Sequence, residues 1–326
     1  MDTARYDQYM SARVGNNEMS PGTKRKYDAA IARFREWWGG AGAPRLEDFQ
    51  DYLLSRAADD DVAGSTLNVE KCAFGKWLSV NQRAGDTAQL REWFSDNFSV
   101  ASGGTSDYLD EEELAAVREA AAEDPRDGAM VAIMSRTGIR ANELVALDTA
   151  DVDFTPLSEG AEGGEIGAYV EIERSKRQEV VLDQRSLTAR QAGLVDAYID
   201  ATDCYGPREA VGSDALFITS TPTRVDSEGV PPVRPDFTEE GVGYTWRPTM
   251  GYVRKRVTAI GERTDHPDVD GDRLHPHLFR HTVGSLLGQS GHSADEIGAY
   301  LGKASPAERY THFDTEQHEE MATALP

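Results

Sequence analysis

The segment Thr137-Gly-Ile-Arg-Ala-Asn-Glu-Leu contains an arginine, Arg140, and a glutamate, Glu143, one helical turn apart. Residues three apart on a helix lie on one face, so Glu143 can hold the guanidinium of Arg140. A held guanidinium presents a fork of N–H donors that fits two phosphate oxygens. The pair therefore indicates an anion-binding site, although ion pairs of this kind are also common on ordinary helix surfaces.

A second candidate segment is His275-Pro-His-Leu-Phe-Arg-His-Thr, in which His277 and Arg280 are again three residues apart. This spacing predicts a second phosphate clamp on another helix face. The alternative is a metal site, because His277 and His281 are four residues apart. Zinc protease helices carry a glutamate after the first histidine, whereas this chain has Leu278, so the sequence favours the clamp over a metal.

A third segment, Tyr300-Leu-Gly-Lys-Ala-Ser-Pro-Ala-Glu-Arg-Tyr-Thr-His, ends in a tyrosine, Tyr310, flanked by Arg309 and His312. A phenol with a pKa of about 10 needs a base and a positive field to act as a nucleophile at neutral pH. A tyrosine near a C-terminus is more commonly a surface or packing residue. Its interpretation therefore depends on the two arginine segments.

Hydrophobic periodicity predicts a mainly α fold with a small β-sheet. Helical spacing covers residues 20–38, 46–56, 65–80, 87–98, 109–122, 126–137, 189–202, 249–262, 276–290 and 294–301, with a last short helix around Tyr310. Alternation over 169–173 and 179–182, around a charged turn at 174–177, predicts a β-hairpin. We expect a helical domain over residues 1–100, a linker over 101–106 and a second domain over 107–326, with a surface insertion near 222–243.

The charge balance argues, at first sight, against a polyanionic partner. The chain has 34 basic and 57 acidic residues, which gives a net charge of −23. Of the basic residues 7 are lysine, so 34 − 7 leaves 27 arginines, and acids gather in runs such as residues 59–61. This composition indicates a surface adapted to high salt. At molar salt the Debye length is about 3 Å, so global repulsion is screened and arginines in direct contact decide binding.

Cysteine usage and hydropathy exclude several other classes of protein. Cys72 and Cys204 stand alone, so neither a zinc ribbon nor a disulfide framework is expected. The sequence has no apolar run of about 18 residues and no signal-peptide layout, so we expect a cytoplasmic protein without membrane contact.

Taken together and in this order, these segments resemble the tyrosine recombinase and integrase family. Its members carry a T-G-[LI]-R-x-x-E-L box, a lysine in a β-hairpin, an H-x-x-R-H-T box, a histidine or tryptophan in an L-G-H-like box, and a tyrosine followed by T-H. The matching positions in this chain are Arg140 with the supporting Glu143, Lys176, His277, Arg280 and Tyr310. Lys303 stands at the histidine or tryptophan position, and its spacing to Tyr310 is about two residues shorter than is usual in the family.

The resemblance implies an N-terminal SAM-like core-binding domain that clamps DNA, followed by a catalytic domain. It also implies that the chain cleaves and rejoins DNA through a 3′-phosphotyrosyl intermediate, without a metal or nucleotide cofactor. Lys176 would act as general acid, although Arg174 and Arg177 share its turn. The implied partners are duplex DNA and further copies of the chain, assembled as a tetramer on two DNA sites, with the tail 311–326 docked on a neighbour.

Two alternatives remain open at this stage. The first is a catalytically inactive DNA-binding relative, which Lys303 and the short spacing favour. The second is an acidic helical scaffold that does not bind nucleic acid.

Overall fold

The computed structural model describes residues 3–16, 19, 21–40, 42–59, 62–98, 107–154, 165–176, 179–204, 213–225, 237–239, 242–302, 321–323 and 325. These residues form two compact units, one among residues 1–105 and the other among residues 106–226 and 231–326. No helix in the described ranges combines the length and the apolar character that a membrane span needs.

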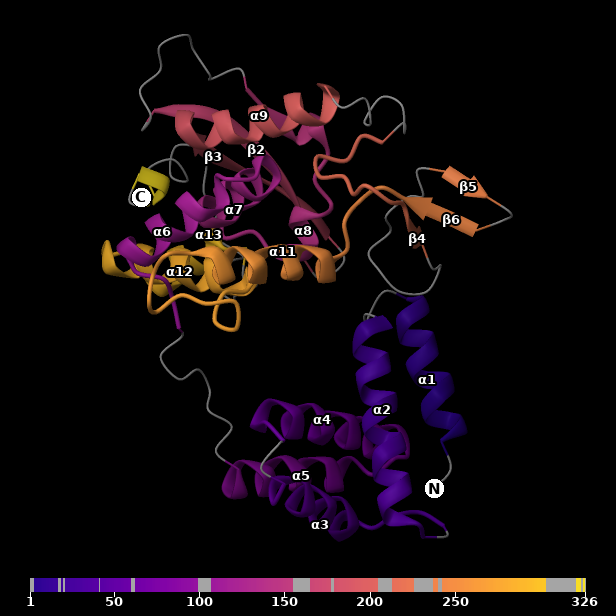
Figure 1. The fold of residues 1–326 in the computed structure, drawn as a ribbon. Helices are drawn as coiled ribbons and strands as arrows, with labels where there is room; N and C mark the ends of the chain where they lie inside the picture. The colour runs from indigo at the N-terminus through magenta and orange to yellow at the C-terminus, as the bar shows by residue number, and fades with distance from the viewer. Residues whose placement is uncertain are drawn as a thin grey trace. The chain divides into compact units, whose positions relative to one another are not determined.

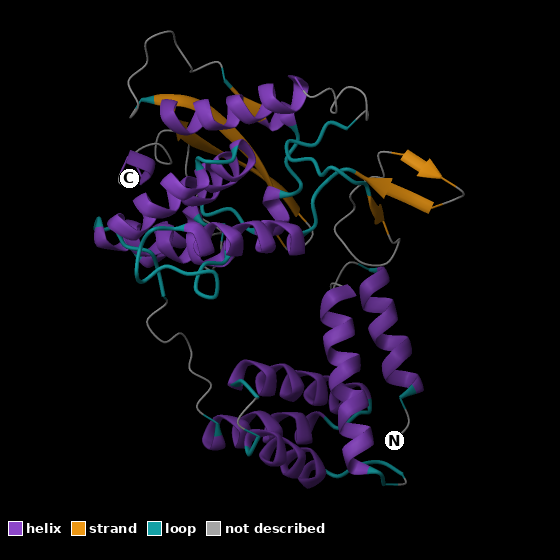
Figure 2. Ribbon diagram, viewed as in Figure 1, coloured by secondary structure: helices purple, strands orange, loops and turns teal. Residues whose placement is uncertain are grey.

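The first unit contains helices and, among its described residues, no strand (Figure 2). Its helices are α1 (Ala4–Gly15), α2 (Pro21–Trp38), α3 (Leu46–Ala57), α4 (Gly64–Val80) and α5 (Ala84–Asn97). Its core is rich in aromatic side chains that α2, α3 and α4 bring together, with the rings of Phe34 and Phe49 stacked at 4.4 Å and Phe74 against both. The four helices predicted from periodicity are confirmed.

Helix α1 is the element of this unit that the periodicity did not predict. It buries Tyr6 and Met10 and packs against α2 and α4. Two buried side chains in twelve residues leave most of the helix solvated, so its apolar stripe is too narrow to identify from sequence.

The second unit is an antiparallel sheet with helices packed around it. Its helices are α6 (Glu111–Ala121), α7 (Pro125–Thr137), α8 (Ala141–Leu144), the 3₁₀ turn η1 (Thr149–Asp151), α9 (Ala189–Cys204), α11 (Met250–Arg263), α12 (Pro276–Gln289) and α13 (Ala294–Tyr300). Its main sheet has the order β1 (Val152–Asp153), β2 (Ile166–Lys176) and β3 (Glu179–Thr188). A second sheet has the order β4 (Thr223–Val225), β6 (Val242–Thr245) and β5 (Phe237–Glu239).

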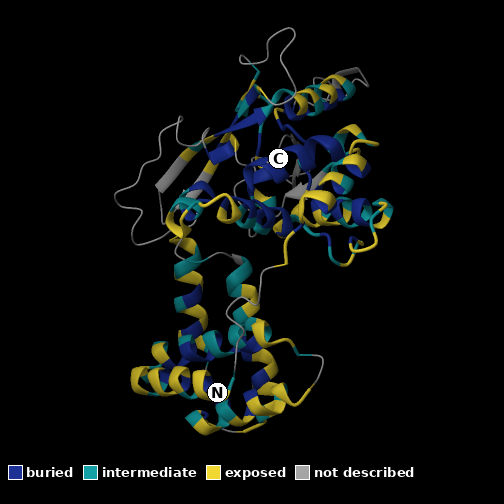
Figure 3. Cartoon of the chain, turned by 90° about the vertical axis from the view of Figure 1, so that its left-hand side faces the viewer, coloured by how far each residue is buried: buried dark blue, intermediate teal, exposed yellow. Residues whose placement is uncertain are grey.

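Helix α7 forms the centre of this unit, because its residues from Asp127 to Thr137 are all buried. It packs against α9, which lies along the β2–β3 hairpin in Figure 1, and against β3 and α12. Figure 3 shows the same centre as the dark blue region of the unit. Its buried Asp127 accepts from Arg256 at 2.8 Å and from Arg263, both on α11. These ion pairs join α11 to the central helix.

The predicted hairpin is confirmed, but its strands are longer than predicted. Strand β2 continues through the expected charged turn to Lys176, which pairs with Glu179. The predicted insertion near 222–243 contains the three short strands of the second sheet rather than irregular chain alone. Too few residues alternate there for a period to be recognised. The predicted helix around Tyr310 lies outside the described residues.

Candidate active site

Arg140 is the N-cap residue just before helix α8, and its guanidinium is held by Glu143 as predicted. Arg140 Nη1 donates to Glu143 Oε1 at 2.7 Å, and the Arg140 backbone N–H donates to Glu143 Oε2 at 2.9 Å. The arginine side chain is 37% exposed, whereas that of the glutamate is 7% exposed. A buried carboxylate thus orients an arginine fork that remains accessible to a ligand.

Arg280 lies on α12, and the residue is 2% exposed. Its Nη1 donates to the carbonyl oxygen of Gly138 at 2.8 Å, and its Nη2 donates to that of Leu301. Two elements far apart in sequence therefore fix the orientation of this second guanidinium.

The two arginines meet at the end of α13. Arg140 Nη2 lies 3.5 Å from the carbonyl oxygen of Gly302, the residue after the Leu301 that Arg280 contacts. Gly138 accepts from the guanidinium of Arg280, and two residues further along the same chain segment is Arg140. The structure thus brings together the two segments that the sequence singled out as phosphate clamps.

His277 shares this electrostatic environment. Its ring lies 4.5 Å from that of His281, at an interplanar angle of 83°. Partial burial and then the positive charges of His281, Arg280 and Arg140 lower the pKa of His277 below its usual 6.5. The imidazole is therefore neutral at neutral pH and able to accept a proton.

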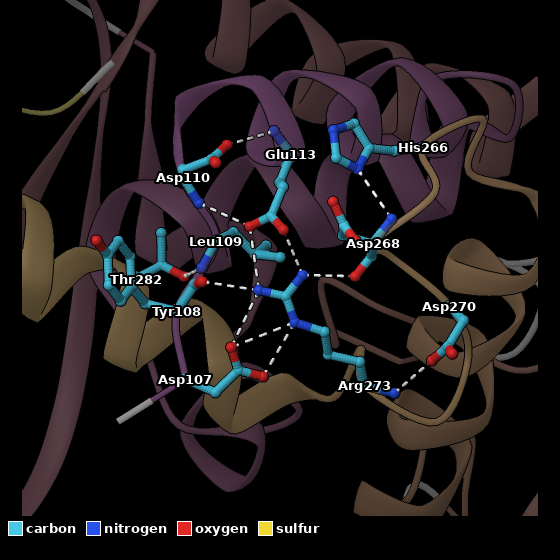
Figure 4. Close-up of polar contacts among 10 residues, drawn as sticks. All are labelled: Asp107, Tyr108, Leu109, Asp110, Glu113, His266, Asp268, Asp270, Arg273 and Thr282. Atoms are coloured by element: carbon cyan, nitrogen blue, oxygen red, sulfur yellow. Dashed lines mark hydrogen bonds and ion pairs between the residues drawn. The ribbon is translucent and has the colours of Figure 1, made fainter. Parts of the chain in front are cut away.

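Helix α12 is anchored to the first residues after the predicted linker (Figure 4). Arg273, just before α12, donates to both carboxylate oxygens of Asp107, at 3.0 to 3.2 Å, and to both of Glu113. Within α12, Thr282 Oγ1 accepts from the Leu109 backbone N–H at 2.9 Å. These contacts lie on either side of His277 and Arg280 in the sequence and so hold the part of α12 that carries them.

Metal-ligating side chains come together at one place among the described residues, where Glu113, His266 and Asp268 have ligand atoms within 4.8 Å of one another. Both oxygens of this glutamate already accept from Arg273, whose charge takes the place of a metal ion there. In the part of the chain that the structure describes, no third ligand joins His277 and His281.

The remaining predicted residues lie at the edge of the described ranges or outside them. Lys176 is the last residue of β2, and the structure describes its backbone only. Lys303 and Tyr310 lie outside the described residues, beyond Gly302. The structure therefore brings together Arg140, Glu143, His277 and Arg280, with their supporting contacts. The roles of Lys176, Lys303 and Tyr310 stay predictions.

Gly138 carries a steric requirement at this site. It ends α7 in the left-handed region, with φ 60°, and a Cβ atom there would lie 2.5 Å from Leu301 Cδ2. We expect Gly138→Ala to destabilise the protein by at least the left-handed penalty of about 1–2 kcal/mol.

In thermal unfolding this destabilisation corresponds to a fall in Tm of several degrees, at about 2–4 °C per kcal/mol for a unit of this size. Gly291→Ala is the control, since Gly291 has φ 94° and no neighbouring atom within 4 Å of a Cβ. Equal effects of the two substitutions would contradict the contact with Leu301.

Two oriented arginines and a neutral histidine on a mostly helical unit have the chemistry needed to bind a phosphate group. Residues 107–317 match the model of the phage integrase family. The match covers more than half of the chain and includes all the predicted site positions. The chain belongs to this family of tyrosine recombinases.

The chain is similar to curated proteins named tyrosine recombinase XerC. It is 27% identical to that of Bifidobacterium longum (strain DJO10A) over 203 residues, which cover 60% of this chain and 46% of the relative. It is 24% identical to that of Serratia marcescens over 211 residues, which cover 63% and 55%. The chain thus spans about half the length of the curated relatives it matches.

Solved structures with a similar fold include two DNA complexes. One is the XerH site-specific recombinase bound to its difH substrate before cleavage, with a TM-score of 0.56, 18% identity and coverage of 92% of this chain and 78% of that one. The other is the Tn1549 transposon integrase with circular intermediate DNA, with a TM-score of 0.59, 14% identity and coverage of 98% and 99%. At these identities the similarity establishes the fold.

Proposed function

We propose that this protein is a site-specific DNA recombinase that cleaves and rejoins duplex DNA through a covalent bond between Tyr310 and a 3′ phosphate. The observation that carries the proposal is the meeting of Arg140 with His277 and Arg280 of α12, within a family match that extends past Tyr310. The similarity to recombinases solved on DNA supports duplex DNA as the partner.

The reaction follows from the charge that develops on the phosphate. The Tyr310 oxygen attacks phosphorus, and its proton passes to the neutral His277. Negative charge on the non-bridging oxygens is met by the two arginine forks, since preorganised donors in a water-poor site are worth about 3–4 kcal/mol each. The bond from phosphorus to the 5′ oxygen breaks, and Lys176 supplies the proton that this leaving oxygen needs. Joining is the reverse reaction, with the 5′ hydroxyl of another strand.

Assembly and environment belong to the same proposal. Two DNA sites hold four copies of the chain, and the tail 311–326 docks on a neighbouring subunit. Lys303 donates to a phosphate oxygen as a point charge in place of the family's histidine or tryptophan.

The net charge of −23 is compatible with DNA binding at high salt, because electrostatic repulsion beyond about 3 Å is then screened. The cytoplasm is the proposed place of action.

The pH dependence of cleavage tests the role of His277. Because its folded pKa lies below 6.5, the neutral imidazole is present above that value, and both its function and its contribution to stability are lost as the pH falls through the lowered pKa. We expect the cleavage rate to show an acid limb below pH 6.5.

His281→Phe keeps a ring beside His277 and removes one of the charges that lower its pKa. The acid limb should therefore move to higher pH in this variant, measured as single-turnover rates across about pH 5–8. A limb that stays in place would contradict the assignment of His277 as the titrating group.

The proposed function is tested by trapping the protein on DNA. Duplexes from the DNA flanking the gene, each with a nick a few nucleotides beyond a possible scissile phosphate, lose the short leaving fragment after cleavage. We expect a protein–DNA adduct that survives denaturant, at one or more salt concentrations.

The other outcomes separate the alternatives. Salt-dependent binding without an adduct would identify a catalytically inactive DNA-binding relative. Neither binding nor adduct at any salt would identify an acidic scaffold.

A further inference from the structure

The C-terminal end of α13 is bound by three arginine side chains. Three consecutive carbonyl oxygens each accept from a different arginine: Tyr300 O from Arg185 Nη2 at 2.7 Å, Leu301 O from Arg280 Nη2, and Gly302 O from Arg140 Nη2 at 3.5 Å. The last carbonyls of a helix lack intrahelical partners and carry partial negative charge, so cationic donors stabilise them. Two of the three donors are the proposed phosphate clamp, and the third, Arg185, has no role in the mechanism above.

Arg185 is an unusual residue for its position. It lies on β3 with 1% of its surface exposed, and its guanidinium stacks 4.7 Å from the ring centre of Tyr300. It also donates to Gln184 O at 2.8 Å and lies 3.4 Å from a carboxylate oxygen of Asp183. Replacing a buried ion pair by apolar side chains is commonly neutral or stabilising, so stability alone does not explain an arginine here. Its bond to the Tyr300 carbonyl oxygen is a contact that an apolar side chain cannot make.

The location of Arg185 relates two parts of the proposed reaction. On β3 it pairs with Val170 of β2, the strand whose last residue is Lys176. Its guanidinium reaches the end of α13, from which the chain continues to Tyr310 eight residues beyond Gly302. One side chain thus joins the hairpin of the proposed general acid to the helix end that precedes the proposed nucleophile.

We propose that Arg185 is a positioning residue that holds the end of α13 against the β2–β3 hairpin and so fixes the point from which the chain leaves toward Tyr310. This inference rests on the proposed function. A misplacement of about 1 Å at a reacting group lowers rates by about 100-fold, so loosening this anchor acts on the chemical step rather than on DNA affinity.

The test compares the buried Arg185 with a partly buried arginine, Arg118, given the same substitution. Arg185→Met keeps the apolar stem of the side chain but removes the guanidinium and its donors. Arg118→Met is the control, because the Arg118 guanidinium donates to Ser135 Oγ at 3.1 and 3.3 Å, on the α6–α7 side of the unit. We expect Arg185→Met to slow single-turnover adduct formation at saturating protein by about 10- to 100-fold. Its DNA affinity should stay within about twofold of the parent, and Arg118→Met should keep the parental rate.

Hydrogen–deuterium exchange provides a readout that does not depend on activity. The backbone amides of Leu301 and Gly302, just after α13, donate to the carbonyl oxygens of Ile297 and Ala299 in that helix. We expect peptides covering 297–302 to exchange at least about tenfold faster in Arg185→Met than in the parent and in Arg118→Met. If the parent forms no adduct, the proposed function fails, while the exchange rates still test the anchor.

Several results would overturn the inference: parental exchange at 297–302, a parental rate of adduct formation, or a loss of DNA affinity as large as the loss of rate. Should Arg185→Met fail to fold, Arg185→Lys takes its place. A single ammonium cannot reproduce the planar fork that bonds two carbonyl oxygens, so an intermediate rate and faster exchange are expected. If Arg185→Lys kept both the parental rate of adduct formation and the parental exchange at 297–302, the role assigned to Arg185 would be contradicted.

Discussion

Replacement of Arg280 by alanine is expected to lower the rate of DNA cleavage by about 100- to 1000-fold or more, the effect of deleting one preorganised donor to a developing oxyanion. The guanidinium is buried, and Gly138 and Leu301 orient it through their carbonyl oxygens. A group held in this way loses little entropy when it meets the phosphate, so its removal acts mainly on the transition state. Single-turnover cleavage at saturating protein measures the effect.

Two further variants separate catalysis from stability in this experiment. Arg280→Ala leaves two carbonyl oxygens without their donor, which lowers the free energy of unfolding by about 1–3 kcal/mol for each. The Tm of the variant must therefore be measured alongside its rate. Gly138→Ala disturbs the same contact region but keeps the guanidinium, and Arg280→Lys keeps the charge but loses the fork. We expect cleavage to fall far more in both Arg280 variants than in Gly138→Ala. Equal losses would mean that Arg280 acts through the fold and not as a clamp.

The second large effect is expected at Lys176, at the end of the β2 strand. If its ammonium protonates the leaving 5′ oxygen, Lys176→Met should slow cleavage by about 100- to 10,000-fold, the range for general acid catalysis. A substrate with sulfur in place of that bridging oxygen expels a thiolate, which needs no proton. This substrate should restore most of the rate of Lys176→Met and little of the rate of Arg280→Ala.

The comparison also decides between neighbouring cations. Arg174 and Arg177 are close to Lys176 in the sequence, but a guanidinium stays protonated at neutral pH and is therefore a poor proton donor there. Each arginine changed to methionine should therefore show no selective rescue by the sulfur substrate. Rescue of an arginine variant, with none for Lys176→Met, would transfer the general-acid role to that arginine.

The sequence alone predicted the helices that bury a wide apolar stripe and the pairing of Arg140 with Glu143. Three-residue spacing fixes which side chains share a helix face, so local spacing alone predicts this pair. Helix α1 was missed because it buries little besides Tyr6 and Met10. Both Arg140 and Arg280 contact the chain at the end of α13. This meeting could be expected only from the family resemblance, since periodicity carries no information on long-range contacts.

Arg185 and Arg273 escaped sequence analysis for a different reason. Arginine is mostly an exposed residue, and the strand predicted over 179–182 ended before Arg185. The strand period did contain a signal, because Arg185 has the same parity as the buried Leu187 and opposite parity to Leu182, which is 58% exposed. The acceptors of both arginines include backbone carbonyls, and no residue type in the sequence marks those as partners.

The most direct measurement is the chemical identity of the protein–DNA linkage. Trypsin cleaves after Arg309, and the sequence from Tyr310 to Pro326 contains no further lysine or arginine and one tyrosine. After nuclease treatment of the trapped adduct, mass spectrometry should find the residual nucleotide on this peptide, attached through Tyr310, and no adduct should form with Tyr310→Phe. A nucleotide on any other residue, or an adduct that persists in Tyr310→Phe, would contradict the account.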